Sequence, residues 1–177
     1  MRTWDTAVKN ALRAYVNRDA YVYLYGAKNV LLKDRATVEM YMNLEPAYFS
    51  KYTNEEKEQI IRNSIGRIGI DCSAFTGWIC TGDLQYSTGQ KNNSVPNKSI
   101  CDGVAGSILY TTFGGAGRHI GIDIGYGYCL HTGWESTDEN IRKKRDSIVL
   151  QYMHNHSIDW EYSGKSNVID YTGADNR

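Results

Sequence analysis

The tripeptide Asp71-Cys72-Ser73 holds a cysteine in a place that suits a nucleophile. The segment before it, residues 67–70, is short, apolar and interrupted by glycine, which is typical of a short strand. After it, Phe75, Trp78 and Ile79 follow the spacing of a helix with one buried face. Asp71 is a good N-cap for that helix. A cysteine in the first turn feels the helix dipole and the unpaired backbone N–H groups, which favour thiolate over thiol. We therefore predict that Cys72 is a nucleophile at the start of a helix.

A partner for this thiol lies in residues 118–132, where the pattern predicts a β-hairpin. Isoleucines at 120, 122 and 124 alternate with other residues, which is the period of a half-buried strand. Gly125-Tyr126-Gly127 predicts a tight turn, and residues 128–132 predict the returning strand. The register gives three facing pairs, which are Ile124 with Tyr128, Ile122 with Leu130, and Gly121 with His131.

The same register places His119 and His131 diagonally on one face of the hairpin, about 7 Å apart at their β-carbons. Gly121 lies between them and leaves that face open. A nucleophile, a base and an orienting group form a hydrolase site, so Cys72 would attack a carbonyl, His119 would hold the proton, and His131 would fix the tautomer of His119. Each residue alone is more typical of a buried thiol or a sheet surface, but together they favour catalysis.

At these positions the chain resembles the NlpC/p-sixty family of papain-like cell-wall cysteine peptidases. The matching segments are Asp71-Cys72-Ser73-Ala74-Phe75, the stretch from His119 to Gly127, and Leu130-His131. Weaker similarity lies in Tyr23-Leu24-Tyr25-Gly26-Ala27 and in Gly106-Ser107-Ile108-Leu109-Tyr110. The good part of the resemblance covers about residues 66–135.

This resemblance implies an α+β, papain-like fold in which a helical N-terminal part, with the nucleophile at a helix N-terminus, packs on an antiparallel β-sheet. The implied catalytic residues are Cys72, His119 and His131, and the implied substrate-binding residues are Asp71 and Ser73, which would help to hold a free amine, and Tyr23 on the oxyanion side. Family members cut the bond between D-glutamate and a diamino acid in peptidoglycan stem peptides. We therefore expect a cell-wall hydrolase of the endolysin kind that requires no metal or organic cofactor.

Three departures from the family pattern bear on the substrate. Ala74 replaces the usual glycine, which is a mild change. Asp123 stands where many relatives have an aromatic or aliphatic residue, so we expect a more acidic cleft floor. About forty residues separate Gly26 from Asp71, where relatives have a much shorter connection.

The residues of this longer connection, about 28–66, predict a helical insertion within a single catalytic domain that spans residues 1–177. Thr53-Asn54-Glu55-Glu56 is a capping-box pattern that opens a helix reaching Ile65. Residues 35–42 predict another helix, followed by a break at Pro46. These helices either wall one side of the cleft or form a structural addition that never meets the substrate.

Two rival functions use the same residues. In the first, a thiol amidase, acyltransferase or toxin-like hydrolase acts on another amide or thioester, and Asp123 and the helical insertion favour it. In the second, the domain is a non-catalytic wall-binding or virion module. The presence of the cysteine together with both histidines speaks against that second function.

The N-terminal residues predict an amphipathic helix that packs on the core through one apolar stripe. The stripe comprises Trp4, Ala7, Val8, Ala11, Leu12, Tyr15 and Val16. No stretch approaches the roughly twenty apolar residues that cross a membrane, and interleaved charges after Met1 do not fit a signal peptide. We expect synthesis in the cytoplasm and action on the cell wall after release, or as part of a phage or prophage particle.

Length and charge limit the classes of function that the chain can have. With 177 residues and 41% apolar content, the chain can bury a core without metals or disulfides. Twenty basic and twenty acidic residues cancel, so no net field attracts nucleic acid or anionic lipid, and the basic run at 142–145 is expected on a solvated face.

The four cysteines include no Cys-x-x-Cys pair and so do not predict a zinc site. A disulfide between Cys80 and Cys101 is an alternative that the sequence does not exclude. The His154-Asn155-His156 segment is expected to be a polar turn rather than a metal site. Residues 91–98 predict an exposed loop, and residues 168–171 predict an edge strand.

Overall fold

A computed structural model of the chain describes residues 1–83, 85–112, 118–133, 147–153 and 159–175. The basic run at 142–145 and the His154–His156 pair lie outside these residues. The α-helices are α1 (Trp4–Val16), α2 (Arg35–Met42), α3 (Pro46–Phe49), α4 (Asn54–Ser64), α5 (Cys72–Ala74) and α6 (Ser87–Asn92). Short helices of other types are η1 (Arg18–Ala20), η2 (Phe75–Thr81) and η3 (Ile100–Asp102). None of the helices in these described ranges has the length and apolarity to cross a bilayer.

The strands form one large and two small sheets. The large sheet has the order β5-β10-β6-β7-β8-β9, and each neighbouring pair in it is antiparallel. Its strands are β5 (Ser94–Pro96), β6 (Ile108–Thr111), β7 (His119–Gly125), β8 (Tyr128–Thr132), β9 (Ile148–Tyr152) and β10 (Tyr162–Ser166). The small sheets pair β1 (Arg2–Thr3) with β11 (Ile169–Asp170), and β4 (Ile68–Ile70) with β2 (Tyr21–Tyr23) and β3 (Lys28–Leu31). The architecture is therefore α+β with an antiparallel main sheet.

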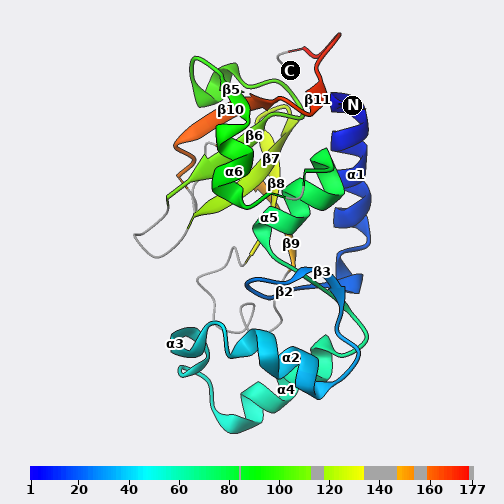
Figure 1. The fold of residues 1–177 in the computed structure, drawn as a ribbon, viewed down its shortest axis with the longest axis vertical. Helices are drawn as coiled ribbons and strands as arrows, with labels where there is room; N and C mark the ends of the chain where they lie inside the picture. The colour runs from blue at the N-terminus through cyan, green and yellow to red at the C-terminus, as the bar shows by residue number, and fades with distance from the viewer. Residues whose placement is uncertain (84, 113–117, 134–146, 154–158, 176–177) are drawn as a thin grey trace.

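Helix α1 and the continuous helix α5–η2 cover one face of the large sheet (Figure 1). The core between them contains Ala7, Ala11, Ala14, Ile70, Ala74, Phe75, Cys80, Ile122, Leu130, Ile148 and Ile169. The predicted stripe of α1 is only partly right, because Leu12 and Val16 are exposed. Ala7 and Ala11 of the stripe are buried as predicted, together with Ala14, and these small side chains allow α1 to pack closely on η2.

The helix that carries Cys72 begins as predicted but then widens. Asp71 caps it, since its carboxylate accepts the N–H of Ala74 at 2.8 Å. From Phe75 to Thr81 the turns are of the π type, and Gly82, in the left-handed region with φ of 77°, ends the helix. Because a π turn takes more residues than an α turn, the spacing argument fails for Trp78, which is 46% exposed.

The residues of the predicted insertion contain both expected helices, α2 and α4. The capping box of α4 is present, with Thr53 and Glu56 each bonding the other's backbone N–H. Strand β3 and the four-residue helix α3 at Pro46 were not predicted. The helices lie at one end of the molecule, beyond β2 and β3 (Figure 1). They share a second core made of Val22, Leu24, Ala27, Leu32, Val38, Met42, Phe49, Ile60 and Ile61.

The β7–β8 hairpin follows most of the predicted register. Gly121 pairs with His131 and Ile122 with Leu130, as expected. The expected Ile124–Tyr128 pair is wrong, because a bulge after Asp123 makes Gly125 the partner of Tyr128. The turn itself has only two residues, Tyr126 and Gly127, both with positive φ (55° and 79°), as in a type I′ hairpin.

Three further expectations concern residues 91–98, the C-terminal tail and the cysteines. The predicted loop at 91–98 is wrong, since these residues include the end of α6 and strand β5. The predicted tail strand exists as β11, which pairs in parallel with β1 rather than joining the large sheet. All four cysteines are free thiols, so Cys80 and Cys101 do not pair.

Candidate active site

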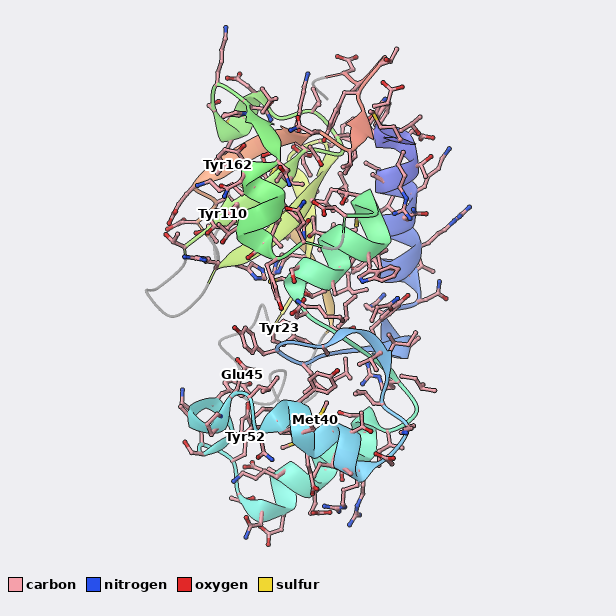
Figure 2. The ribbon with its side chains drawn as sticks, viewed as in Figure 1. Tyr23, Met40, Glu45, Tyr52, Tyr110 and Tyr162 are labelled. Atoms are coloured by element: carbon pink, nitrogen blue, oxygen red, sulfur yellow. The ribbon has the colours of Figure 1, made fainter. Side chains whose placement is uncertain are left out.

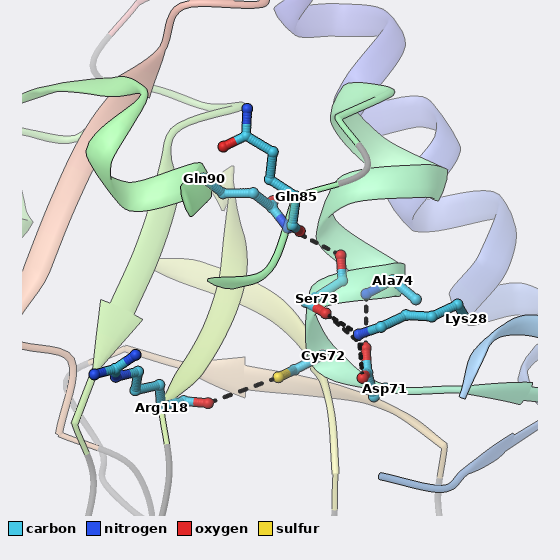
Figure 3. Close-up of polar contacts among 8 residues, drawn as sticks. All are labelled: Lys28, Asp71, Cys72, Ser73, Ala74, Gln85, Gln90 and Arg118. Atoms are coloured by element: carbon cyan, nitrogen blue, oxygen red, sulfur yellow. Dashed lines mark hydrogen bonds and ion pairs between the residues drawn. The ribbon is translucent and has the colours of Figure 1, made fainter. Parts of the chain in front are cut away.

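Cys72 is the first residue of α5, where the chain leaves β4 and turns onto the large sheet. Its side chain packs on Ile108 and Ile120, and the residue is only 9% exposed. Its Sγ donates to the backbone carbonyl of Arg118 at 3.9 Å, directly before β7 (Figure 3). The thiol therefore lies against the backbone at the start of the strand that begins with His119.

The expectation that Cys72 is poised as a thiolate is wrong for this structure. Burial raises the pKa of its thiol to about 12, and the negative charge of Asp71 adds to the effect. Hydrogen bonds from the backbone N–H groups of Ile120 and Ser73 favour the thiolate but do not outweigh burial. The continuous helix α5–η2 that begins at Cys72 also favours the thiolate through its dipole, but burial outweighs it.

His119 and His131 meet as the sequence predicts. Nε2 of His119 and Nδ1 of His131 are 3.1 Å apart, and their rings stand at 86° to one another. Nδ1 of His119 is thus the nitrogen left for proton transfer. In the described part of the chain Sγ of Cys72 bonds the Arg118 carbonyl rather than an imidazole. Such catalytic contacts are commonly long before substrate binds.

Trp160 covers the histidine pair, a role that no sequence pattern predicts. Its ring stacks on His119 with centroids 5.5 Å apart and meets His131 edge-on at 5.7 Å. The expectation that Gly121 leaves this face open is wrong, because a Cβ there would stand 2.9 Å from Trp160. The glycine instead allows the indole to close over both imidazoles.

Both imidazoles are neutral at physiological pH. Burial lowers the pKa of His119 well below 6.5, and the positive charge that His131 would carry lowers it further. Burial also lowers the pKa of His131 to about 4. The pair therefore shares one proton between its facing nitrogens, and His119 is a neutral base.

Asp71 and Ser73, the residues expected to hold a substrate amine, already bind an amine of the chain itself. The Nζ atom of Lys28, from β3, lies 2.5 Å from Oδ2 of Asp71 and 2.5 Å from Oγ of Ser73 (Figure 3). Ser73 in turn donates to Oδ1 of Asp71 at 2.9 Å. The same ammonium lies 4.9 Å from the ring centroid of Tyr86. A substrate amine at this position would have to displace Lys28.

Tyr23 and Asp123 lie in different surroundings. Tyr23 ends β2 and lies opposite Ile70 in the strand that leads to Cys72, between the large sheet and the helices α2–α4 (Figure 2).

Asp123 is 3% exposed and accepts the N–H of Gly125 at 2.7 Å, so it stabilises the hairpin bulge. The expected acidic cleft floor is therefore wrong, because this carboxylate is enclosed beside Ser163 and Gly103.

No family model matches this chain, and neither does any curated protein. Among the residues that the structure describes, no three His, Cys, Asp or Glu side chains gather as metal ligands would. The chemistry of the site therefore depends on Cys72, the two histidines and the groups around them.

Proposed function

We propose that this chain is a papain-like cysteine peptidase of the NlpC type that hydrolyses an amide bond in peptidoglycan stem peptides, between D-glutamate and a diamino acid. The observation that carries the proposal is the 3.1 Å contact of His119 with His131 at the start of β7, beside the thiol of Cys72. A helix-borne thiol packed on an antiparallel sheet that supplies the base supports the papain-like assignment. The protein would reach the cell wall after release from the cytoplasm or as part of a phage particle.

The reaction begins with two neutral groups. As Sγ of Cys72 attacks the carbonyl carbon, its proton passes to Nδ1 of His119, and the imidazolium is stabilised through Nε2 by His131. The backbone N–H of Cys72 at the helix start would bind the tetrahedral oxyanion, with Tyr23 beside it. His119 then gives its proton to the leaving amine. Water, with His119 again as base, releases the acyl group from sulfur.

The decisive experiment is digestion of purified cell walls, with mass spectrometry of the released fragments. Walls containing diaminopimelate and walls containing lysine are both needed, because the diamino acid is part of the proposal. Cys72→Ala should release nothing, whereas the matched control Cys101→Ala, at an exposed cysteine, should act as the unaltered protein. Release of fragments by Cys72→Ala, or none by the unaltered protein, would reject the proposal.

A second candidate, a thiol amidase or acyltransferase on another substrate, is favoured by one observation. Lys28 neutralises Asp71, so the polar group beside the nucleophile does not require a substrate amine. An acyl donor without such an amine would then fit the site equally well. Cleavage of small amides or thioesters by the unaltered protein and not by Cys72→Ala, with intact walls untouched, would select this function.

A further inference from the structure

A buried glutamine, Gln151 on β9, lies behind the histidine pair. Cys129 of β8 pairs with Gln151, and His131 pairs with Val149, so Gln151 is the diagonal neighbour of His131 on the same face of the sheet. Gln151 is 2% exposed and His131 is fully buried. A buried carboxamide is costly unless both its oxygen and its NH2 group have hydrogen-bond partners.

Two nitrogen atoms at this contact have no hydrogen-bond partner in the described part of the chain. They are Nε2 of His131 and Nε2 of Gln151. As its diagonal neighbour, Gln151 is within reach of the His131 ring, and Nδ1 of that ring is already taken by His119. Nε2 of His131 is therefore the atom that faces the carboxamide.

Half a turn of the carboxamide satisfies both atoms. The oxygen of Gln151, which now accepts the thiol of Cys129 at 3.8 Å, would move to His131, and its NH2 group would face the sulfur. An amide's oxygen and nitrogen exchange places in this turn, and the hydrogen-bond network decides which arrangement holds. The turned arrangement gives Nε2–H of His131 a strong acceptor, while sulfur is a weak acceptor for the amide N–H.

This acceptor decides where the proton shared by the two histidines lies. If His131 carries hydrogen on Nε2, its Nδ1 is an acceptor, so His119 must donate from Nε2 and keeps Nδ1 free as a base. If His131 instead carries hydrogen on Nδ1, it donates to Nε2 of His119, whose own hydrogen then sits on Nδ1. In that second tautomer His119 cannot take the thiol proton.

We propose that Gln151 is a positioning residue that accepts Nε2–H of His131 and thereby holds His119 in the tautomer able to act as base. It touches no substrate atom and acts only through the two rings. The order of donors runs from His119 to His131 to Gln151, and each donor has one acceptor. Loss of one buried hydrogen bond changes such an equilibrium about ten- to a hundredfold.

The test reads the tautomers directly by ¹⁵N NMR of histidine-labelled protein, which has only four histidines. In the unaltered protein near neutral pH, both His119 and His131 should carry hydrogen on Nε2. In Gln151→Met, which keeps the length and loses the acceptor, His131 should shift toward the Nδ1–H tautomer. Gln151→Glu, which keeps an oxygen, should restore Nε2–H. Leu150→Met, on the same strand but the other face, is the matched control and should match the unaltered protein.

Kinetics give the second readout, which rests on the proposed function. Turnover by Gln151→Met should fall about ten- to a hundredfold with little change in KM, and Gln151→Glu should recover most of it. An Nδ1–H tautomer of His131 in the unaltered protein, or unchanged nitrogen shifts in Gln151→Met, would overturn the inference even if the protein proves to be a hydrolase. The NMR measurement needs no substrate, so it still tests the role of Gln151 if the proposed peptidase activity is not found.

Discussion

Burial governs the chemistry of the individual residues in the candidate site. Cys72, with a thiol pKa raised to about 12, and His119, with a pKa well below 6.5, form a neutral pair rather than a thiolate and an imidazolium. Trp160 stacks on one face of the His119 ring and shields that face, which favours the neutral imidazole. In the proposed mechanism catalysis then depends on proton transfer during attack, so the position of the base matters more than the charge of the thiol.

This neutral state changes the expected order of alkylation. We predict that iodoacetamide labels Cys101 before Cys72, because Cys101 is exposed whereas Cys72 is buried and protonated. Cys80 and Cys129 are buried and should react last. Timed labelling with peptide mass spectrometry measures the order. Faster labelling of Cys72 would show that the thiolate does form in the free protein.

The two histidines should respond differently to substitution. His119→Ala should be inactive, because in the proposed mechanism His119 takes the thiol proton and protonates the leaving amine. His131→Ala should lose on the order of a hundredfold to ten-thousandfold in turnover, by analogy with the orienting member of a serine triad. His131→Asn or His131→Gln should retain measurable activity, since an amide oxygen can accept from His119. Full activity of His131→Ala on a defined stem peptide would reduce the site to a dyad.

Lys28 allows a test of what Asp71 and Ser73 bind. We expect the unaltered protein to cleave an N-acetylated stem peptide at least as well as one with a free amine, because Lys28 fills the amine position. Lys28→Met vacates that position, so the free-amine peptide should gain about tenfold in relative kcat/KM, the order of a charge-assisted hydrogen bond. Lys33→Met, at an exposed lysine just after β3, is the control. An unchanged ratio would show that Asp71 serves only Lys28.

At the scale of elements, the close approach of η2 to the following loop holds the helix that carries Cys72. Gly77 allows it, because a Cβ there would stand 2.0 Å from the backbone oxygen of Asp83. A backbone atom cannot move aside as a side chain does, so we expect Gly77→Ala to lower the free energy of unfolding by more than about 2 kcal/mol. Gly66→Ala, at a positive φ of 85° but with open space, should cost only about 1 kcal/mol. Equal losses in urea titrations would contradict this steric argument.

The hairpin shows which parts of an element a sequence can predict. Alternating isoleucines were sufficient for the register that brings Gly121 opposite His131, and hence for the contact of the histidines. The bulge after Asp123 could not be read, because it depends on a carboxylate that bonds Gly125 from within the fold. The composition of residues 91–98 predicts a loop where β5 lies, because β5 is a polar edge strand whose Val95 is 58% exposed.

The missed site residues share one cause. Lys28, Gln151 and Trp160 reach the site from strands or loops far from Cys72 in the chain, and no local pattern connects them to it. Gln151 alone had a signal, since a glutamine in the apolar strand from Ile148 to Tyr152 indicates a buried polar contact. Tertiary packing, which local spacing does not encode, brings these residues to the site.

At the scale of the whole molecule, three buried groups control how stability depends on pH. His119 and His131 have lowered pKa values, that of His131 being about 4, so below about pH 6.5 the unfolded chain binds protons that the folded chain does not. Asp123 has a pKa raised to about 6 by burial, so between about pH 4 and 6 the folded chain holds a proton that the unfolded chain releases. The histidines make stability fall as pH drops, and Asp123 opposes them.

Asp123→Asn separates these contributions. The amide oxygen can still accept the N–H of Gly125, while the cost of burying a charge disappears, so the variant should be more stable by about 2 kcal/mol near pH 7.5. Near pH 4, where Asp123 is already protonated, the gain should vanish, so the melting temperature of the variant should fall more steeply with acid. His131→Gln should flatten the same curve, because one of the two opposing histidines is removed. Melting curves across this pH range measure all three proteins, and a gain for Asp123→Asn that is constant with pH would show that the charge of Asp123 is not what burial penalises.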